Sequence, residues 1–155
     1  MNRSELIKIA WQTGNLTYKV REYQDELWAK IQEVVQHHTW EPFVLNCSRR
    51  FGKSTLGMLA LIQEALKYPG TSYIFVAPTE GHAKEIVLDV TPVLIQDAPD
   101  EFKPVFKNGR FSFPNGSEIR IGGAYNGGES LRGRRSESTR LNSSHSAKSR
   151  MPSSA

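Results

Sequence analysis

The segment CSRRFGKST, residues 47–55, holds the side chains best suited to chemistry in this sequence. Its last four residues, Gly-Lys-Ser-Thr, are the residues that end a phosphate-binding loop. In such a loop, backbone N–H groups and the N-terminus of a helix face the phosphate oxygens. We therefore expect residues 47–55 to bind a nucleoside triphosphate.

Each residue of this loop has an expected role. The Lys53 ammonium group reaches the β and γ phosphates, and the Ser54 hydroxyl is a ligand to the Mg²⁺ that accompanies the nucleotide. Gly52 has no Cβ, so the backbone can approach the phosphates closely. Cys47, a small residue, replaces the first glycine of the usual pattern. The rest of the predicted nucleotide-binding set is Ser48, Arg50, Phe51 and Thr55.

The same four residues could instead open an ordinary helix, with Ser54 as its cap. The flanking sequence favours the nucleotide. FVLN, residues 43–46, predicts a buried strand that ends at the loop, and apolar spacing predicts a helix over 53–67 with Leu56, Leu59, Ile62 and Leu66 inward. Tyr68-Pro69-Gly70 ends that helix.

The other elements follow from apolar periodicity and turn signals. The pattern predicts helices over 4–12, 22–37 and 80–96, a buried strand over 72–78, and β segments over 103–107, 110–113 and 117–122. The β segments are separated by Asn108-Gly109 and Asn115-Gly116, and Asn-Gly is the strongest short hairpin signal. This order predicts an α/β fold with a parallel unit.

Hydrolysis would also need an apolar strand that ends in acidic residues, which hold Mg²⁺ and orient water. IVLD, residues 86–89, has this composition. However, its apolar residues continue at helical spacing, so we expect a helix there. No other segment qualifies.

Composition excludes some classes of protein. A chain of 155 residues is enough for one domain, and a single cysteine allows no internal disulfide, which suits a reducing compartment. No apolar run predicts a membrane span or a signal peptide, so we expect no membrane partner and no secretion. The net charge of +4 comes mainly from residues 135–155, so it does not predict nucleic-acid binding by the body.

Four stretches resemble the large terminase subunit of tailed bacteriophages. The loop itself is similar, with Arg49 and Arg50 inside it and the first glycine replaced. REYQDELW resembles the glutamine motif of that family, and YIFVAPTEGHAKEI its second strand and helix. PNGSEIRIGGAYNGGESLRGRR resembles the hairpin and glycine-rich stretch before its acidic strand. The resemblance covers about residues 20–134.

The resemblance implies a P-loop NTPase domain of the RecA-like (ASCE) type, with a β-hairpin insertion and truncated before the acidic Walker B strand. It implies that Gln24 hydrogen-bonds the adenine edge with Tyr23 packed nearby. The alternative is a core Tyr23 and an exposed Gln24. Arg49 would join Lys53 in catalysis by stabilising charge on the transferred phosphoryl group. Its alternative role is a surface ion pair.

The implied function is hydrolysis of ATP with Mg²⁺ to package double-stranded DNA into a capsid, in the host cytoplasm. The implied partners are the small terminase subunit, the portal protein and further copies in a ring. Two alternatives stay open, a helicase-like ATPase and a non-catalytic nucleotide-binding stub. The family's nuclease domain has no counterpart here, and we expect this chain by itself to be inactive.

Residues 135–155, RSESTRLNSSHSAKSRMPSSA, are polar and rich in serine, so no core can be built from them. They resemble a translated sequencing adapter, and the alternative is a natural disordered tail. We therefore expect an ATPase segment over 1–134 and a disordered, non-native tail over 135–155.

Overall fold

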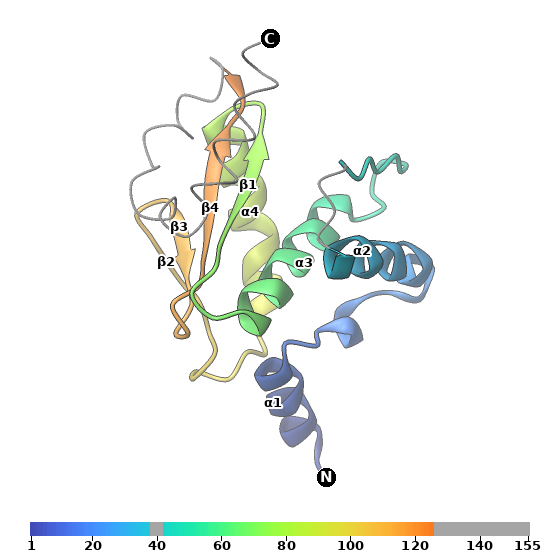
Figure 1. Ribbon diagram of the computed structural model, residues 1–155, viewed down its shortest axis with the longest axis vertical. Coiled ribbons are helices and arrows are strands. Elements are labelled where there is room, and N and C mark those ends of the chain that lie inside the picture. Colours follow the sequence, from blue (N-terminus) through green and yellow to red (C-terminus); the bar gives the residue numbers. More distant parts are fainter. Residues whose placement is uncertain (38–41, 126–155) are drawn as a thin grey trace.

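The structure is a computed structural model, which describes residues 1–37 and 42–125. It is a mixed α/β structure with one four-stranded sheet (Figure 1). The α/β class predicted from the sequence is confirmed at this level.

The chain begins with helical elements outside the sheet. They are α1 (Arg3–Thr13), the 3-10 turns η1 (Thr17–Lys19) and η2 (Glu22–Gln24), and α2 (Asp25–His37). Asn2 and Glu5 form a capping box at the start of α1, and Gly14 ends it with a φ of 68°. The predicted helices over 4–12 and 22–37 are confirmed, although the first turn of the second is 3-10.

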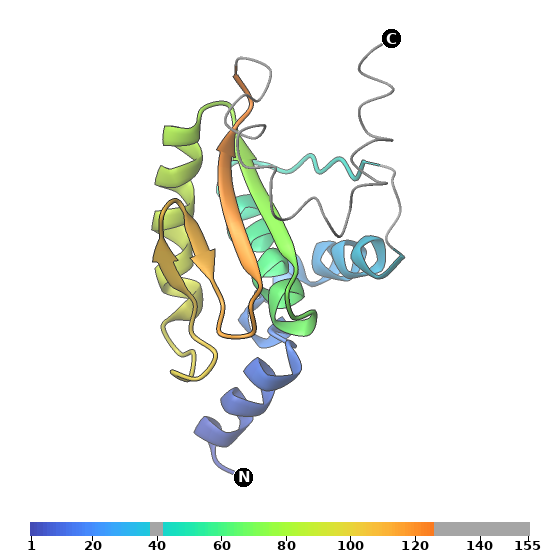
Figure 2. The ribbon, with the colours of Figure 1, turned by 60° about the vertical axis from the view of Figure 1, so that its left-hand side comes forward.

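Two longer helices lie against one face of the sheet, α3 (Lys53–Lys67) and α4 (Glu80–Ile95) (Figure 2). Leu56, Leu59 and Ile62 of α3 are buried as predicted, while Leu66 is only partly buried. The segment IVLD lies within α4 and is therefore helical, as its spacing predicted. Asp89 is exposed on this helix.

The sheet contains β1 (Ser72–Ala77), β2 (Val105–Lys107), β3 (Arg110–Ser112) and β4 (Glu118–Gly123), in the spatial order β1-β4-β3-β2. Strand β1 runs parallel to β4, and the other two pairs are antiparallel. Asn108 and Gly109 both have positive φ, 55° and 73°, as a type I′ hairpin turn requires. The three predicted β segments are confirmed.

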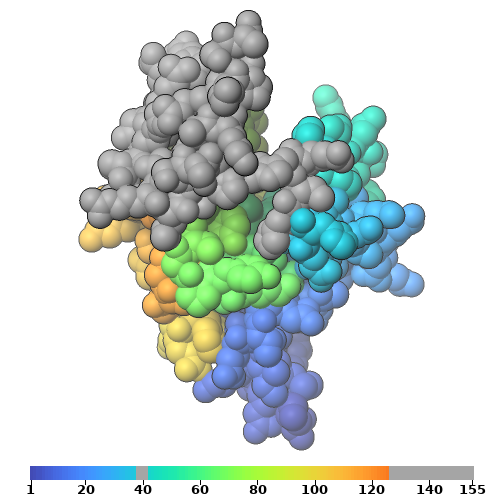
Figure 3. Space-filling model, in the orientation of Figure 1, coloured from blue at the N-terminus to red at the C-terminus, as the bar shows by residue number. Residues whose placement is uncertain are grey.

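The predicted strand over 43–46 is wrong. Residues 42–49 form no helix or strand, and Phe43 and Val44 are exposed. In Figure 3 this segment projects from the body of the molecule. A strand needs a neighbour to satisfy its backbone groups, and none of the described strands pairs with residues 43–46. The apolar composition of residues 43–46 could not predict whether a neighbouring strand would be present.

The strand predicted over 72–78 is present, but its predicted burial is wrong. Strand β1 lies at the edge of the described sheet, and Ile74 and Val76 are exposed. Tyr73 and Phe75 pair in register with the buried Ile119 and Ile121 of β4 and pack against the core. Only one face of β1 is therefore covered.

Candidate phosphate-binding loop

Helix α3 begins with a bare N-terminus. Gly52 is its N-cap, with φ 91° and ψ 30°, and no side chain caps the helix. Ser54 therefore does not cap the helix, which corrects that part of the alternative. The first bond along the helix is made by the Leu56 N–H to the Gly52 carbonyl, at 2.9 Å. The N–H groups in the first turn of a helix have no partner within the helix, so this end can receive an anion.

The Lys53 side chain folds back over the loop that precedes the helix. Its Nζ donates to the carbonyl oxygens of Cys47 and Ser48, at 3.0 Å in each case. Lys53 itself is exposed. Because no carboxylate among the described residues pairs with this ammonium group, its charge is available to an anion.

The loop turns sharply between Ser48 and Gly52. The Phe51 N–H donates to the Ser48 carbonyl at 3.4 Å, and Arg50 has a φ of 64°. A left-handed conformation is uncommon for a residue with a long side chain, and nothing in the sequence signalled it at Arg50. Two left-handed residues, Arg50 at the turn and Gly52 at the helix cap, bring the loop back onto the start of α3.

Arg49 and Arg50 are both exposed. Arg49 makes no ion pair within residues 1–37 and 42–125, so its alternative role as a surface ion pair gains no support there. Cys47 is half-buried. It does not follow a strand, because the strand predicted over residues 43–46 is absent. Ser54 is exposed and Thr55 half-buried in the first turn of α3.

Gln24 reaches the loop from the end of η2, directly before α2. It is only 6% exposed, its Nε2 donates to the Phe51 carbonyl at 2.7 Å, and its Oε1 accepts from the Arg21 N–H at 3.1 Å. Tyr23 is 54% exposed, and its ring meets the Phe51 ring edge-on at 5.4 Å between centroids. The alternative with a core Tyr23 and an exposed Gln24 is therefore wrong. Residues far apart in sequence meet at one loop.

A second polar cluster was not foreseen from the sequence. Asp97 accepts hydrogen bonds from the Tyr18 hydroxyl, at 2.7 Å, and from Lys19 Nζ, and Trp11 Nε1 donates to the same hydroxyl at 3.1 Å. Burial raises the pKa of the Tyr18 hydroxyl, and the bond to Asp97 adds to this. Burial also raises the pKa of Asp97, but the bonds from Lys19 and Tyr18 outweigh it, so the Asp97 pKa is lowered.

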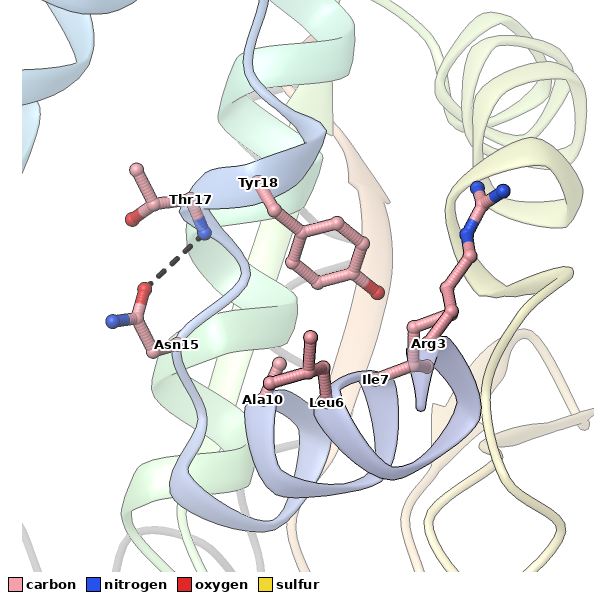
Figure 4. A pocket seen from close by; sticks show the side chains of 7 residues that line it. All are labelled: Arg3, Leu6, Ile7, Ala10, Asn15, Thr17 and Tyr18. Atoms are coloured by element: carbon pink, nitrogen blue, oxygen red, sulfur yellow. Dashed lines mark hydrogen bonds between the residues drawn. The ribbon is translucent and has the colours of Figure 1, made fainter. Parts of the chain in front are cut away.

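An apolar hollow of about 430 Å³ lies beside this cluster, between α1 and η1 (Figure 4). Tyr18 and the α1 residues Leu6, Ile7 and Ala10 line most of it, with Arg3 at one end. None of its lining residues belongs to the predicted nucleotide site, and the hollow lacks paired carboxylates. Its volume alone does not make it the reactive centre.

Within the described ranges, no group of three His, Cys, Asp or Glu residues could hold a metal ion. A Mg²⁺ that enters with a nucleotide needs few protein ligands, because phosphates and water supply the rest. The hydroxyl of Ser54 is a chemically suitable ligand in the first turn of α3. No helix in this part of the chain is both long and apolar enough to cross a membrane.

The loop and the uncapped N-terminus of α3 lie together in a mixed α/β structure. The sequence matches the family described as terminase large subunit, T4likevirus-type, N-terminal, over residues 44–141. This match covers more than half of the chain, so the chain belongs to that family. It extends past residue 134, where we expected the resemblance to end, and residues 126–155 lie outside the described structure. A comparison with curated proteins gave no match.

Proposed function

We propose that residues 47–55 bind the phosphates of Mg·ATP and that this chain is the ATP-binding part of a DNA-packaging ATPase. One observation carries the proposal: the uncapped start of α3 and the Lys53 ammonium group share one loop, closed by left-handed Gly52. Membership of the terminase family supports the role in DNA packaging. The fold proposed for the complete domain is that of a P-loop NTPase, with 1–134 as its part and 135–155 as a tail.

The proposed binding step exchanges one set of partners for another. In the free protein, Lys53 Nζ bonds two loop carbonyls. A triphosphate would draw this ammonium group away, because bonds between a cation and an anionic oxygen are stronger than bonds to a neutral carbonyl. The N–H groups of the first turn of α3 would receive a second phosphate oxygen. Ser54 would contribute its hydroxyl to the Mg²⁺ that accompanies ATP.

Arg49 has the freedom that a charge-stabilising residue needs, because it is exposed and unpaired among the described residues. We propose that it stabilises negative charge on the phosphoryl group during transfer. Neither β1 nor β4 ends in acidic residues, since they end at Ala77 and Gly123. We therefore expect binding of ATP by this chain without turnover. Double-stranded DNA, the small subunit, the portal and a ring of copies are proposed partners of the complete protein, in the host cytoplasm.

The test is calorimetric titration of the full 155-residue chain with Mg·ATP. Lys53→Ala removes the proposed phosphate contact, and we expect affinity to fall at least about tenfold, equivalent to about 1.4 kcal/mol. Lys30→Ala is the matched control, because Lys30 is an exposed lysine on α2 with only a loose surface pair to Glu33. Equal affinities of wild type and Lys53→Ala would contradict the proposed site.

A further inference from the structure

We propose that Gln24 is a positioning residue for the phosphate-binding loop, which it directs through the Phe51 carbonyl. The inference rests on the proposed function. It differs from the adenine contact that the family resemblance implies, because it assigns the Gln24 amide to the loop backbone. Its consequence is that Gln24 affects the binding of every triphosphate, whatever the base.

Two hydrogen bonds fix the orientation of the Gln24 side-chain amide. The Arg21 N–H can only donate, so the atom 3.1 Å from it must be the oxygen Oε1. The other end is then the NH₂ group, which donates to the Phe51 carbonyl at 2.7 Å. Gln24 is only 6% exposed, so water competes little for these groups. The amide is therefore held between η2 and the loop.

The bond to Phe51 also fixes the next backbone N–H. A peptide unit is planar and trans, so its C=O and N–H point in opposite directions. Gln24 holds the Phe51 carbonyl on its own side, and the Gly52 N–H is therefore directed away from Gln24. This N–H immediately precedes Lys53 and the N–H groups of the first turn of α3. Gln24 thus sets the direction of one donor of the proposed phosphate site.

Two independent observations favour a glycine at residue 52. Its φ of 91° is unfavourable for residues with a side chain. In addition, a Cβ at this position would lie 2.7 Å from Gln24 Nε2. Since the Gln24 amide occupies the space that a side chain would need, Gln24 and Gly52 work as a pair.

The two possible roles of Gln24 predict different patterns of ligand binding. A residue that reads adenine contributes to ATP and not to ligands that lack adenine. A residue that positions the loop contributes equally to ATP, GTP and inorganic tripolyphosphate. Tripolyphosphate is the cleanest probe, because it has no base.

The experiment titrates the full chain with Mg²⁺ complexes of these three ligands. Gln24→Glu keeps the acceptor for the Arg21 N–H but cannot donate to the Phe51 carbonyl, and Gln24→Met fills similar space without hydrogen-bonding. The matched control is Gln36→Ala, since Gln36 is an exposed glutamine on α2, the helix that directly follows η2. Thermal unfolding of each variant establishes that it is folded at the titration temperature.

We expect each Gln24 variant to weaken the binding of all three ligands by a similar factor. The expected factor is about five- to tenfold, as for the loss of one hydrogen bond. Gln36→Ala should match wild type. Weaker binding of ATP with unchanged binding of tripolyphosphate would overturn the inference in favour of a base contact. The proposed function would then still hold. Unchanged binding of all three would also overturn it. If wild type binds none of them, the proposed function fails, and the inference with it.

A backbone readout keeps the test decisive if either variant unfolds. In wild type, the hydrogen bond from Gln24 to the Phe51 carbonyl should affect the chemical shift of the Gly52 amide in nuclear magnetic resonance spectra. This chemical shift should change in whichever Gln24 variant folds. An unchanged Gly52 amide in a folded Gln24→Glu or Gln24→Met protein would overturn the inference without any ligand.

Discussion

The two sides of the candidate phosphate-binding loop differ in how well they are packed. Behind the loop, α3 is buried against α4 and the sheet, with Leu56 and Ile62 almost completely covered. In front of the loop, residues 42–49 form no regular element, and Val44 is 84% exposed. The loop is therefore held from the helix side and by Gln24, rather than from both sides.

This difference shows what each kind of element requires. A helix satisfies its backbone hydrogen bonds within itself, so α3 needs only an apolar face and a surface to cover it. A strand satisfies none of its bonds alone. The described sheet has two edge strands, β1 and β2, and residues 43–46 pair with neither of them. The features of the candidate site that depend on α3 can therefore form although residues 43–46 form no strand.

The largest expected difference is in the free energy of unfolding when the same substitution, valine to alanine, is made in each region. Val87→Ala, at a fully buried position of α4, removes two methyl groups from the core and should lower the free energy of unfolding by about 1.5–3 kcal/mol. Val44→Ala, at the exposed position, should change it by less than about 0.5 kcal/mol. Urea denaturation of both variants measures the difference. Equal losses would mean that residues 42–49 are packed in solution.

A smaller, pH-dependent effect on stability should come from Asp97, which follows α4 and bonds Tyr18 and Lys19 of η1. Asp97 has a lowered pKa in the folded protein, against an ordinary value of 3.8. Its stabilisation is therefore complete well above pH 3.8 and disappears as the pH falls through the lower, folded pKa. Asp97→Asn should cost about 1 kcal/mol near neutral pH.

The control for this prediction is the pH profile itself. The free energies of unfolding of wild type and Asp97→Asn should converge as the pH falls below about 4, because the wild-type carboxyl becomes protonated. A difference that stays constant over this range would contradict the assigned ion pair. Asp100→Asn is a suitable comparison, as a nearby exposed carboxyl.

Local signals explain what the sequence could predict. Apolar spacing located α3 and α4, and Asn108-Gly109 located a hairpin turn, because each signal acts over a few residues. Gly52 was also predictable as the special backbone position of the loop. The edge exposure of β1 and the missing strand over 43–46 were not predictable, because they depend on which strands are neighbours.

The site was predictable to a similar extent. Gly-Lys-Ser-Thr indicated the start of a helix and a lysine near it, and both are present. The bond from Gln24 to Phe51 joins residues 27 positions apart, and the bond from Tyr18 to Asp97 joins residues 79 apart. Sequence spacing carries no signal for such contacts. The left-handed conformation of Arg50 also had no local indication.

The most direct test of phosphate binding at this loop follows the backbone amides by nuclear magnetic resonance. Inorganic tripolyphosphate with Mg²⁺ is added to the full chain, and the N–H resonances of Gly52, Lys53, Ser54 and Thr55 are observed. We predict that these four resonances shift saturably, while those of Leu6 and Ile7 in the apolar hollow stay in place. Unmoved resonances at residues 52–55, with or without shifts elsewhere, would contradict it.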